Sequence, residues 1–131
     1  MTKGTPTILV ADDDLDILSL VTRHLRSTHA SARLLEASDG EEALRIVRRE
    51  KPDLVVLDVM MPGMSGWEVC RNIREDDSLK HTGVIMLTGI GERLNEMTSP
   101  LYGADEFIDK PFELTELDDK IHNVLGKREK T

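Results

Sequence analysis

The chain has 131 residues, 39% of them hydrophobic and 32% charged, so it can bury one ordinary domain core without a disulfide or metal staple. Seventeen basic and 25 acidic residues give a net charge of -8, and aromatic residues make up only 3%. Nucleic-acid affinity comes largely from Lys and Arg, helped by aromatic stacking, so we expect no direct nucleic-acid binding by this domain. The single cysteine excludes an internal disulfide framework and a cysteine-based zinc site.

Apolar runs in the sequence are short, and none approaches the length of a membrane-spanning helix. The first residues are polar and contain no signal-peptide core. We therefore expect a cytoplasmic protein with no membrane partner. The expected organisation is a disordered N-terminus over residues 1–6, one folded domain over 7–126, and a polar tail or the start of a linker over 127–131.

Three apolar runs predict buried strands, at residues 8–11, 54–57 and 84–87. The runs are continuous rather than alternating, which is typical of strands that are buried on both faces of a parallel sheet. Two weaker candidates lie at residues 33–37 and 106–109.

Each predicted strand is followed by apolar residues at helical spacing. These are Leu18, Val21 and Leu25; Ala43, Leu44, Ile46 and Val47; Trp67, Cys70 and Ile73; Leu94, Met97 and Leu101; and Leu114, Leu117, Ile121 and Leu125. Gly40 and Gly66 are expected to begin their helices and Gly126 to end the last one. Pro100 falls inside the fourth pattern, which should shorten, kink or weaken that helix. Strand and helix alternate five times, which predicts an α/β doubly wound (βα)5 three-layer sandwich.

Polar residues end the predicted strands. Asp12, Asp13 and Asp14 follow the first strand, Asp58 the third, Thr88 the fourth and Lys110 the fifth. In a doubly wound sheet, ligands bind beyond the carboxyl ends of the strands, so these groups should converge there. Clustered carboxylates need a cation or a proton, and oxygen ligands without His or Cys favour Mg²⁺. A carboxylate can also attack phosphorus, so the constellation predicts phosphoryl transfer onto Asp58.

The ordered motifs resemble one family across residues 7–125. They are Ile8-Leu9-Val10-Ala11-Asp12-Asp13-Asp14, Asp58-Val59-Met60-Met61-Pro62-Gly63-Met64-Ser65-Gly66, Leu87-Thr88-Gly89, and Gly103-Ala104-Asp105-Glu106-Phe107-Ile108-Asp109-Lys110-Pro111-Phe112. Together they are similar to the receiver domain of a bacterial two-component response regulator. The resemblance implies a flavodoxin-like, five-stranded parallel sheet of order 2-1-3-4-5 over residues 7–126.

The resemblance also assigns the metal and acceptor roles. It makes Asp58 the phosphoacceptor and a ligand of Mg²⁺, together with Asp12, Asp13 and the backbone carbonyl of Met60. Asp14 is instead expected to cap the first helix, since Asp is a favoured N-cap residue.

The remaining roles concern the phosphoryl group and the response to it. Thr88 and Lys110 are implied to contact the phosphoryl oxygens, and Phe107 to be the aromatic residue that moves with Thr88. A cis peptide bond is implied before Pro111. Phe107 as a core residue only is an equally good interpretation.

The function implied by the resemblance is signalling, not enzymatic turnover. A sensor histidine kinase or a histidine phosphotransfer protein would phosphorylate Asp58, and the surface of the fourth helix, fifth strand and fifth helix would then bind a partner or a second copy. Met60 and Ile90 are apolar at positions that influence water access, so self-dephosphorylation should be slow.

Three alternatives remain open from the residues. A receiver fold can serve as an interaction module without phosphate. A phosphatase of the haloacid-dehalogenase type uses a similar Asp, Thr and Lys, but needs an acid where Met60 stands. An FMN protein of this fold needs a phosphate-binding loop where three Asp residues stand. Among the other residues, Trp67 is expected in the core, and His24, His29, His81 and His122 on the surface without ligand spacing.

Overall fold

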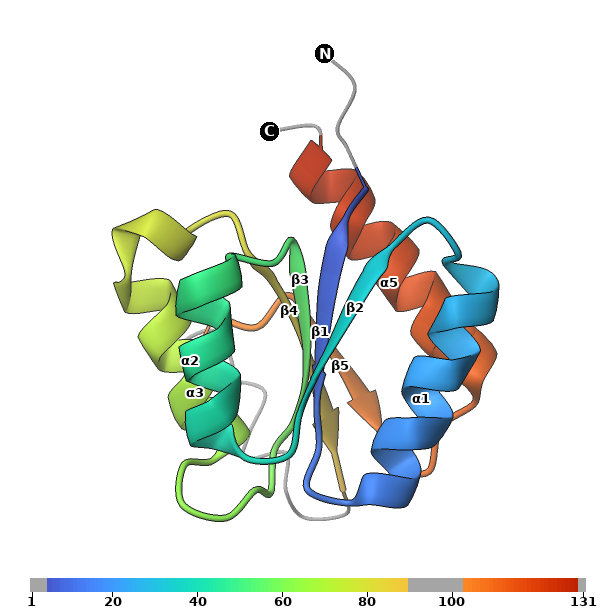
Figure 1. The fold of residues 1–131 in the computed structure, drawn as a ribbon, viewed down its shortest axis with the longest axis horizontal. Coiled ribbons are helices and arrows are strands. Elements are labelled where there is room, and N and C mark those ends of the chain that lie inside the picture. Colours follow the sequence, from blue (N-terminus) through green and yellow to red (C-terminus); the bar gives the residue numbers. More distant parts are fainter. Residues whose placement is uncertain (1–4, 90–102, 130–131) are drawn as a thin grey trace.

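The computed structural model describes residues 5–89 and 103–129. In this part of the chain five parallel strands form one sheet of order β2-β1-β3-β4-β5 (Figure 1). All five predicted strands are present, and the predicted order is confirmed. The strands are β1 (Thr7–Ala11), β2 (Arg33–Ala37), β3 (Leu54–Asp58), β4 (Gly83–Thr88) and β5 (Glu106–Asp109).

Helices cover both faces of the sheet, which confirms the three-layer sandwich (Figure 1). α1 and α5 lie on one face, and α2 and α3 on the other. The fourth helical pattern and Pro100 lie outside the described residues. The described helices are α1 (Leu15–Thr28), α2 (Gly40–Glu50), α3 (Gly66–Glu75), the short 3₁₀ helix η1 (Asp77–Leu79) and α5 (Leu114–Glu129).

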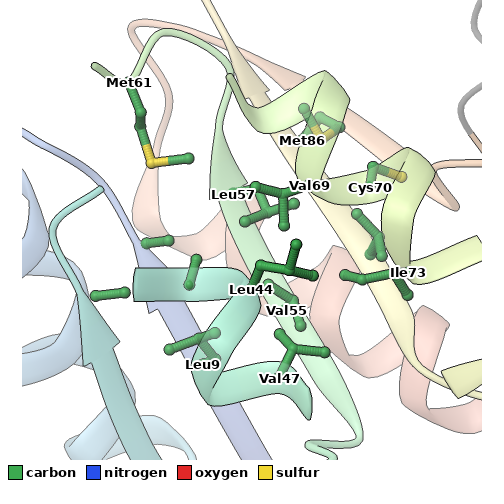
Figure 2. Packing of buried hydrophobic residues seen from close by; sticks show 14 of the residues in the cluster. Leu9, Leu44, Val47, Val55, Leu57, Met61, Val69, Cys70, Ile73 and Met86 are labelled. Carbon is green, nitrogen blue, oxygen red and sulfur yellow. The ribbon is translucent and has the colours of Figure 1, made fainter. Parts of the chain in front are cut away.

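The core consists of two apolar layers, one on each face of the sheet. Figure 2 shows the first layer, where Leu9, Val55 and Leu57 of the strands meet Leu44 of α2 and Val69 of α3. In the second layer, the alternate strand residues pack against α1 and α5. Because side chains of a strand alternate between faces, a strand covered on both sides must be apolar at every position. This explains the continuous apolar runs.

Helix starts follow from local capping. The Asp14 carboxylate accepts hydrogen bonds from the backbone N–H groups of Asp16 and Ile17, which confirms its predicted role as the N-cap of α1. Ser65 and Glu68 form a reciprocal capping box at the start of α3. These caps fix where α1 and α3 leave the carboxyl edge of the sheet.

The end of α5 differs from the expectation. Gly126 does not end this helix, which continues to Glu129. Gly126 also has no positive φ, whereas the described glycines that do are Gly63 and Gly103. A glycine inside a helix costs only about 1 kcal/mol relative to alanine, which is too little to end a helix by itself. None of the described helices is long and apolar enough to cross a membrane.

Candidate functional site

Three carboxylates gather at the carboxyl edge of the sheet. Asp12 and Asp13 follow β1, and Asp58 ends the neighbouring strand β3. One oxygen of each lies within 4.8 Å of the others. Asp12 and Asp58 are buried, with 1% and 3% of their surface exposed, whereas Asp13 is exposed. The site therefore has two buried acids and an open side that faces solvent.

The Asp12 carboxylate has few hydrogen-bond donors among the described residues. Its Oδ1 accepts a hydrogen bond of 2.9 Å from the backbone N–H of Asp14. Its buried Oδ2 has no hydrogen-bond donor among the described residues. Burial raises the pKa of the Asp12 carboxyl, and the Asp14 N–H and the charge of Lys110 offset this only in part. A buried oxygen without a donor, beside two further carboxylates, fits a hard divalent cation such as Mg²⁺.

Lys110 supplies the positive charge on the other side of the acids. Its Nζ lies 2.5 Å from Asp58 Oδ1 and 3.7 Å from Asp12 Oδ2. It stands immediately after β5, and its peptide bond to Pro111 is cis. A compact ammonium held between two buried carboxylates is suited to neutralise negative charge that arrives at Asp58.

Thr88 is the last residue of β4, and it is fully buried. Its hydroxyl donates to Asp109 Oδ1 at 2.8 Å, with the carbonyl of Ile108 at 3.4 Å. Asp109 is the residue opposite Thr88 in the register of β4 and β5. The residues alone did not single out Asp109, although its place beside Lys110 put it at the edge where the strand ends converge.

Phe107 lies two residues before Asp109 on the same strand and packs partly buried against the core layer of α2 and α3. Its ring centroid is 5.8 Å from that of Trp67 on α3, with the planes tilted by 45°. Trp67 is buried in this layer, as predicted. The one tryptophan of the chain is therefore in contact with the aromatic residue expected to move.

The loop that follows Asp58 is held close to the site. Met60 is 60% exposed in this loop. The N–H of Gly66, the first residue of α3, donates to the carbonyl of Val59. A Cβ at Gly66 would lie 2.3 Å from the carbonyl oxygen of Asp58, so only glycine lets α3 start this close to the acceptor strand.

An apolar groove of about 460 Å³ begins beside Lys110. It runs between α1 and the segment after β5, and exposed Leu20 lies on its α1 side. The groove is lined by Ile17, Leu20, Val21, Gly89, Lys110, Pro111, Phe112 and Leu114.

Two histidines that were expected to be scattered on the surface meet at one carboxylate. His24 Nε2 lies 2.7 Å from Asp118 Oδ2, and His29 Nε2 lies 3.2 Å from Asp118 Oδ1. Thr28 donates to the same carboxylate. Burial alone would raise the pKa of Asp118, but the hydrogen bonds from His24 and Thr28 outweigh it and hold the pKa below its ordinary value. These contacts join α1 to α5.

The match to known families covers most of the chain. Residues 8–122 match the model of the response regulator receiver domain. With the parallel sheet and the acids at its carboxyl edge, this match defines the class of protein. The chain belongs to the response regulator receiver domain family of two-component signalling.

The chain is also similar to individual proteins of this family. It is 42% identical over 123 residues to the probable transcriptional regulator ycf27 of Porphyra purpurea, covering 94% of this chain and 49% of that protein. It is 38% identical over 128 residues to the transcriptional regulatory protein AfsQ1 of Streptomyces coelicolor, covering 96% and 55%. The chain thus spans about half the length of the curated relatives it matches. A CheY-like response regulator receiver domain protein from Methanospirillum hungatei superposes with a TM-score of 0.88 at 28% identity, covering 97% of this chain and 98% of that one.

Proposed function

We propose that residues 7–126 form a receiver domain that accepts a phosphoryl group on Asp58 in a Mg²⁺-dependent reaction. The observation that carries the proposal is the buried Asp58 carboxylate, which has Lys110 Nζ 2.5 Å away and an oxygen each of Asp12 and Asp13 within 4.8 Å. The donor is a phosphohistidine on a sensor histidine kinase or a histidine phosphotransfer protein.

In the transfer, a carboxylate oxygen of Asp58 attacks phosphorus. The new O–P bond forms as the P–N bond to the donor imidazole breaks, and the imidazole leaves with the electron pair. Lys110 stays beside the acceptor and balances charge on a phosphoryl oxygen. Asp12, Asp13 and the Met60 carbonyl would hold Mg²⁺, which supplies positive charge to the transferring group when bound.

The apolar groove beside Lys110 favours a protein as the phosphoryl donor. It borders Lys110, which is next to Asp58, and exposes Leu20 of α1 at 52% of its surface. Leu15 at the start of α1 is also 66% exposed. Apolar side chains beside a reactive group suit a partner helix that brings its phosphohistidine over the site.

The phosphoryl group acts by shifting a population between two states. A shift from 1:99 to 99:1 takes about 5.5 kcal/mol. A hydrogen bond to a charged group contributes about 1.5–3 kcal/mol, so contacts from Lys110, Thr88 and a backbone N–H together would suffice. Thr88 moving toward Asp58 leaves space for Phe107, which changes the surface around β5 and α5. That surface then binds a partner protein or a second copy.

The phosphorylated domain transmits its signal by binding a protein and does not itself bind DNA. Its net charge of -8 opposes binding to phosphates. The curated relatives are transcriptional regulators about twice as long, so we place any DNA contact outside this domain.

The test is intact mass after incubation with Mg²⁺ and a small phosphodonor. The wild type should gain one phosphoryl group, while Asp58→Asn and the wild type in excess chelator should gain none. Asp53→Asn is the matched control, because it alters a carboxylate at the opposite end of β3 and should leave the modification intact. Equal modification of Asp58→Asn and the wild type would refute the proposal.

A further inference from the structure

The Thr88 hydroxyl is engaged by an acid that no part of the proposed transfer uses. Its Oγ1 donates to Asp109 Oδ1 at 2.8 Å. The two residues are direct cross-strand partners at the ends of β4 and β5. Thr88 is fully buried, whereas Asp109 is exposed, so the pair reaches from the core to the surface.

A hydroxyl has one proton and donates it to one acceptor at a time. In the structure Asp109 receives that proton. A phosphoryl oxygen on Asp58 would need the same proton from Thr88. The carboxylate of Asp109 and the phosphoryl group therefore compete for one donor, and both are anionic acceptors, which form the stronger kind of hydrogen bond.

Hydrogen bonds tie β5 to its neighbours at both ends, so we expect side-chain rotation to decide the competition. The N–H of Lys110 donates to the carbonyl of Thr88 at 2.6 Å, which holds the end of β5 against β4. At the other end of β5, Asp105 accepts from the N–H of Val84 and from Arg74 of α3. Asp109 consequently stays within reach of Thr88 while β4 and β5 remain paired.

We propose that Asp109 is a positioning residue that holds the Thr88 hydroxyl away from Asp58 and thereby favours the unphosphorylated state. The proposal rests on the function proposed above and assigns its regulation to a residue beside the site. Removing the carboxylate leaves the Thr88 hydroxyl only the longer contact to the Ile108 carbonyl, at 3.4 Å, so the domain converts to the phosphorylated-like state at a lower cost. Asp109 acts through Thr88 and does not contact the phosphoryl group.

The probe is beryllofluoride with Mg²⁺, which stands in for the phosphoryl group without being turned over. Its affinity is measured by calorimetry and by the fluorescence of Trp67, which contacts Phe107. Asp109→Ala should bind about two- to tenfold more tightly than the wild type. This is the range for one ordinary net hydrogen bond, because the Ile108 carbonyl still accepts from Thr88 and offsets part of the lost charged contact. Asp109→Asn should fall between them, because its amide oxygen still accepts a hydrogen bond but is uncharged.

Two controls distinguish an effect of Asp109 on the position of the Thr88 hydroxyl from a general effect of removing negative charge. Glu116→Ala removes the same charge from the first turn of α5, where the carboxylate has no hydrogen bond or ion pair with the described residues, and should leave the affinity unchanged. Asp109→Ala made in a Thr88→Val background should have no further effect, since valine has no proton to release.

The outcomes distinguish the two proposals. A wild type that binds beryllofluoride, with Asp109→Ala equal to it, would overturn the role of Asp109 and leave the receiver function standing. The same tightening with and without the Thr88 hydroxyl would also overturn it, because the effect would then be electrostatic. A wild type that binds no beryllofluoride in Mg²⁺ would contradict the receiver function itself.

Discussion

Replacing Asp12 by Asn should make the metal-free protein more stable and abolish most of its response to Mg²⁺. Asp12 is buried, its Oδ2 lacks a donor among the described residues, and burial raises the pKa of its carboxyl. An acid whose pKa is raised by folding destabilises the folded state once the pH exceeds the ordinary value of 3.8, and the deficit persists at neutral pH. Asn has nearly the same shape without the charge.

The size of the effect follows from the unsatisfied oxygen. A buried polar atom without a partner costs about 1–3 kcal/mol. The amide N–H of Asn can donate to the neighbouring Asp13 and Asp58 carboxylates where the Asp12 oxygen cannot, so the variant should gain about that free energy of unfolding in chelator. For a domain of this length, that corresponds to a rise in Tm of about 4–12 °C. A ligand at 100 times its Kd stabilises the folded state by about 2.7 kcal/mol. Mg²⁺ should stabilise the wild type by this amount and the Asn variant by much less.

The assay is thermal unfolding at pH 7, with excess chelator and with rising Mg²⁺. In chelator the Asn variant should have the higher Tm, and rising Mg²⁺ should raise the Tm of the wild type much more than that of the variant. Asp16→Asn, an exposed acid on the first turn of α1, is the control for a general loss of charge. A less stable Asn variant in chelator, or equal stabilisation of both by Mg²⁺, would refute the reasoning.

Three further predictions concern the packing around the site, the α1–α5 contact and the lifetime of the acyl phosphate. Gly66→Ala should lower the free energy of unfolding, measured in urea, by about 1–3 kcal/mol, because its Cβ would lie 2.3 Å from the Asp58 carbonyl oxygen. Gly126→Ala, whose Cβ would point into open space, should raise it by up to about 1 kcal/mol. Asp118→Asn should lower the free energy of unfolding by about 1 kcal/mol at neutral pH. This difference should vanish as the pH falls through the lowered pKa of Asp118, below 3.8. Thermal unfolding at a series of acidic pH values measures it. The acyl phosphate should last minutes or longer by intact mass after donor removal, because Met60 beside the site cannot orient an attacking water.

Each of these has a clear contrary result. Equal stability of the two alanine variants would show that α3 does not depend on a close approach to β3. A stability difference for Asp118→Asn that grows on acidification would contradict its lowered pKa. Decay of the acyl phosphate within seconds, with no phosphatase present, would contradict the lifetime argument.

The strands were predictable because burial on both faces leaves an unmistakable pattern. The runs at 54–57 and 84–87 lie in the two central strands β3 and β4, where every residue is buried. Even the weaker candidates at 33–37 and 106–109 match β2 and β5, the two edges of the sheet, in their limits. The strand order came from the resemblance, since apolar patterns do not specify which strands are neighbours.

The meeting of Asp12, Asp13, Asp58 and Lys110 could be expected from topology, because parallel strands end at one edge. The partner of the Thr88 hydroxyl could not, because it depends on the register of β4 against β5. For the same reason, the contact of His24 with Asp118, 94 positions apart, depends on how α1 lies against α5. Such pairs leave no local signal in the sequence.

Phosphorylation at Asp58 is tested most directly by locating the acyl phosphate on the chain. The protein is phosphorylated in Mg²⁺ with a small donor, reduced with borohydride so that an aspartyl phosphate becomes homoserine, and mapped by peptide mass spectrometry. The expected result is homoserine at Asp58, and none there when chelator replaces Mg²⁺. Homoserine at Asp12 or Asp13, or a phosphorylated protein with no homoserine at all, would contradict it.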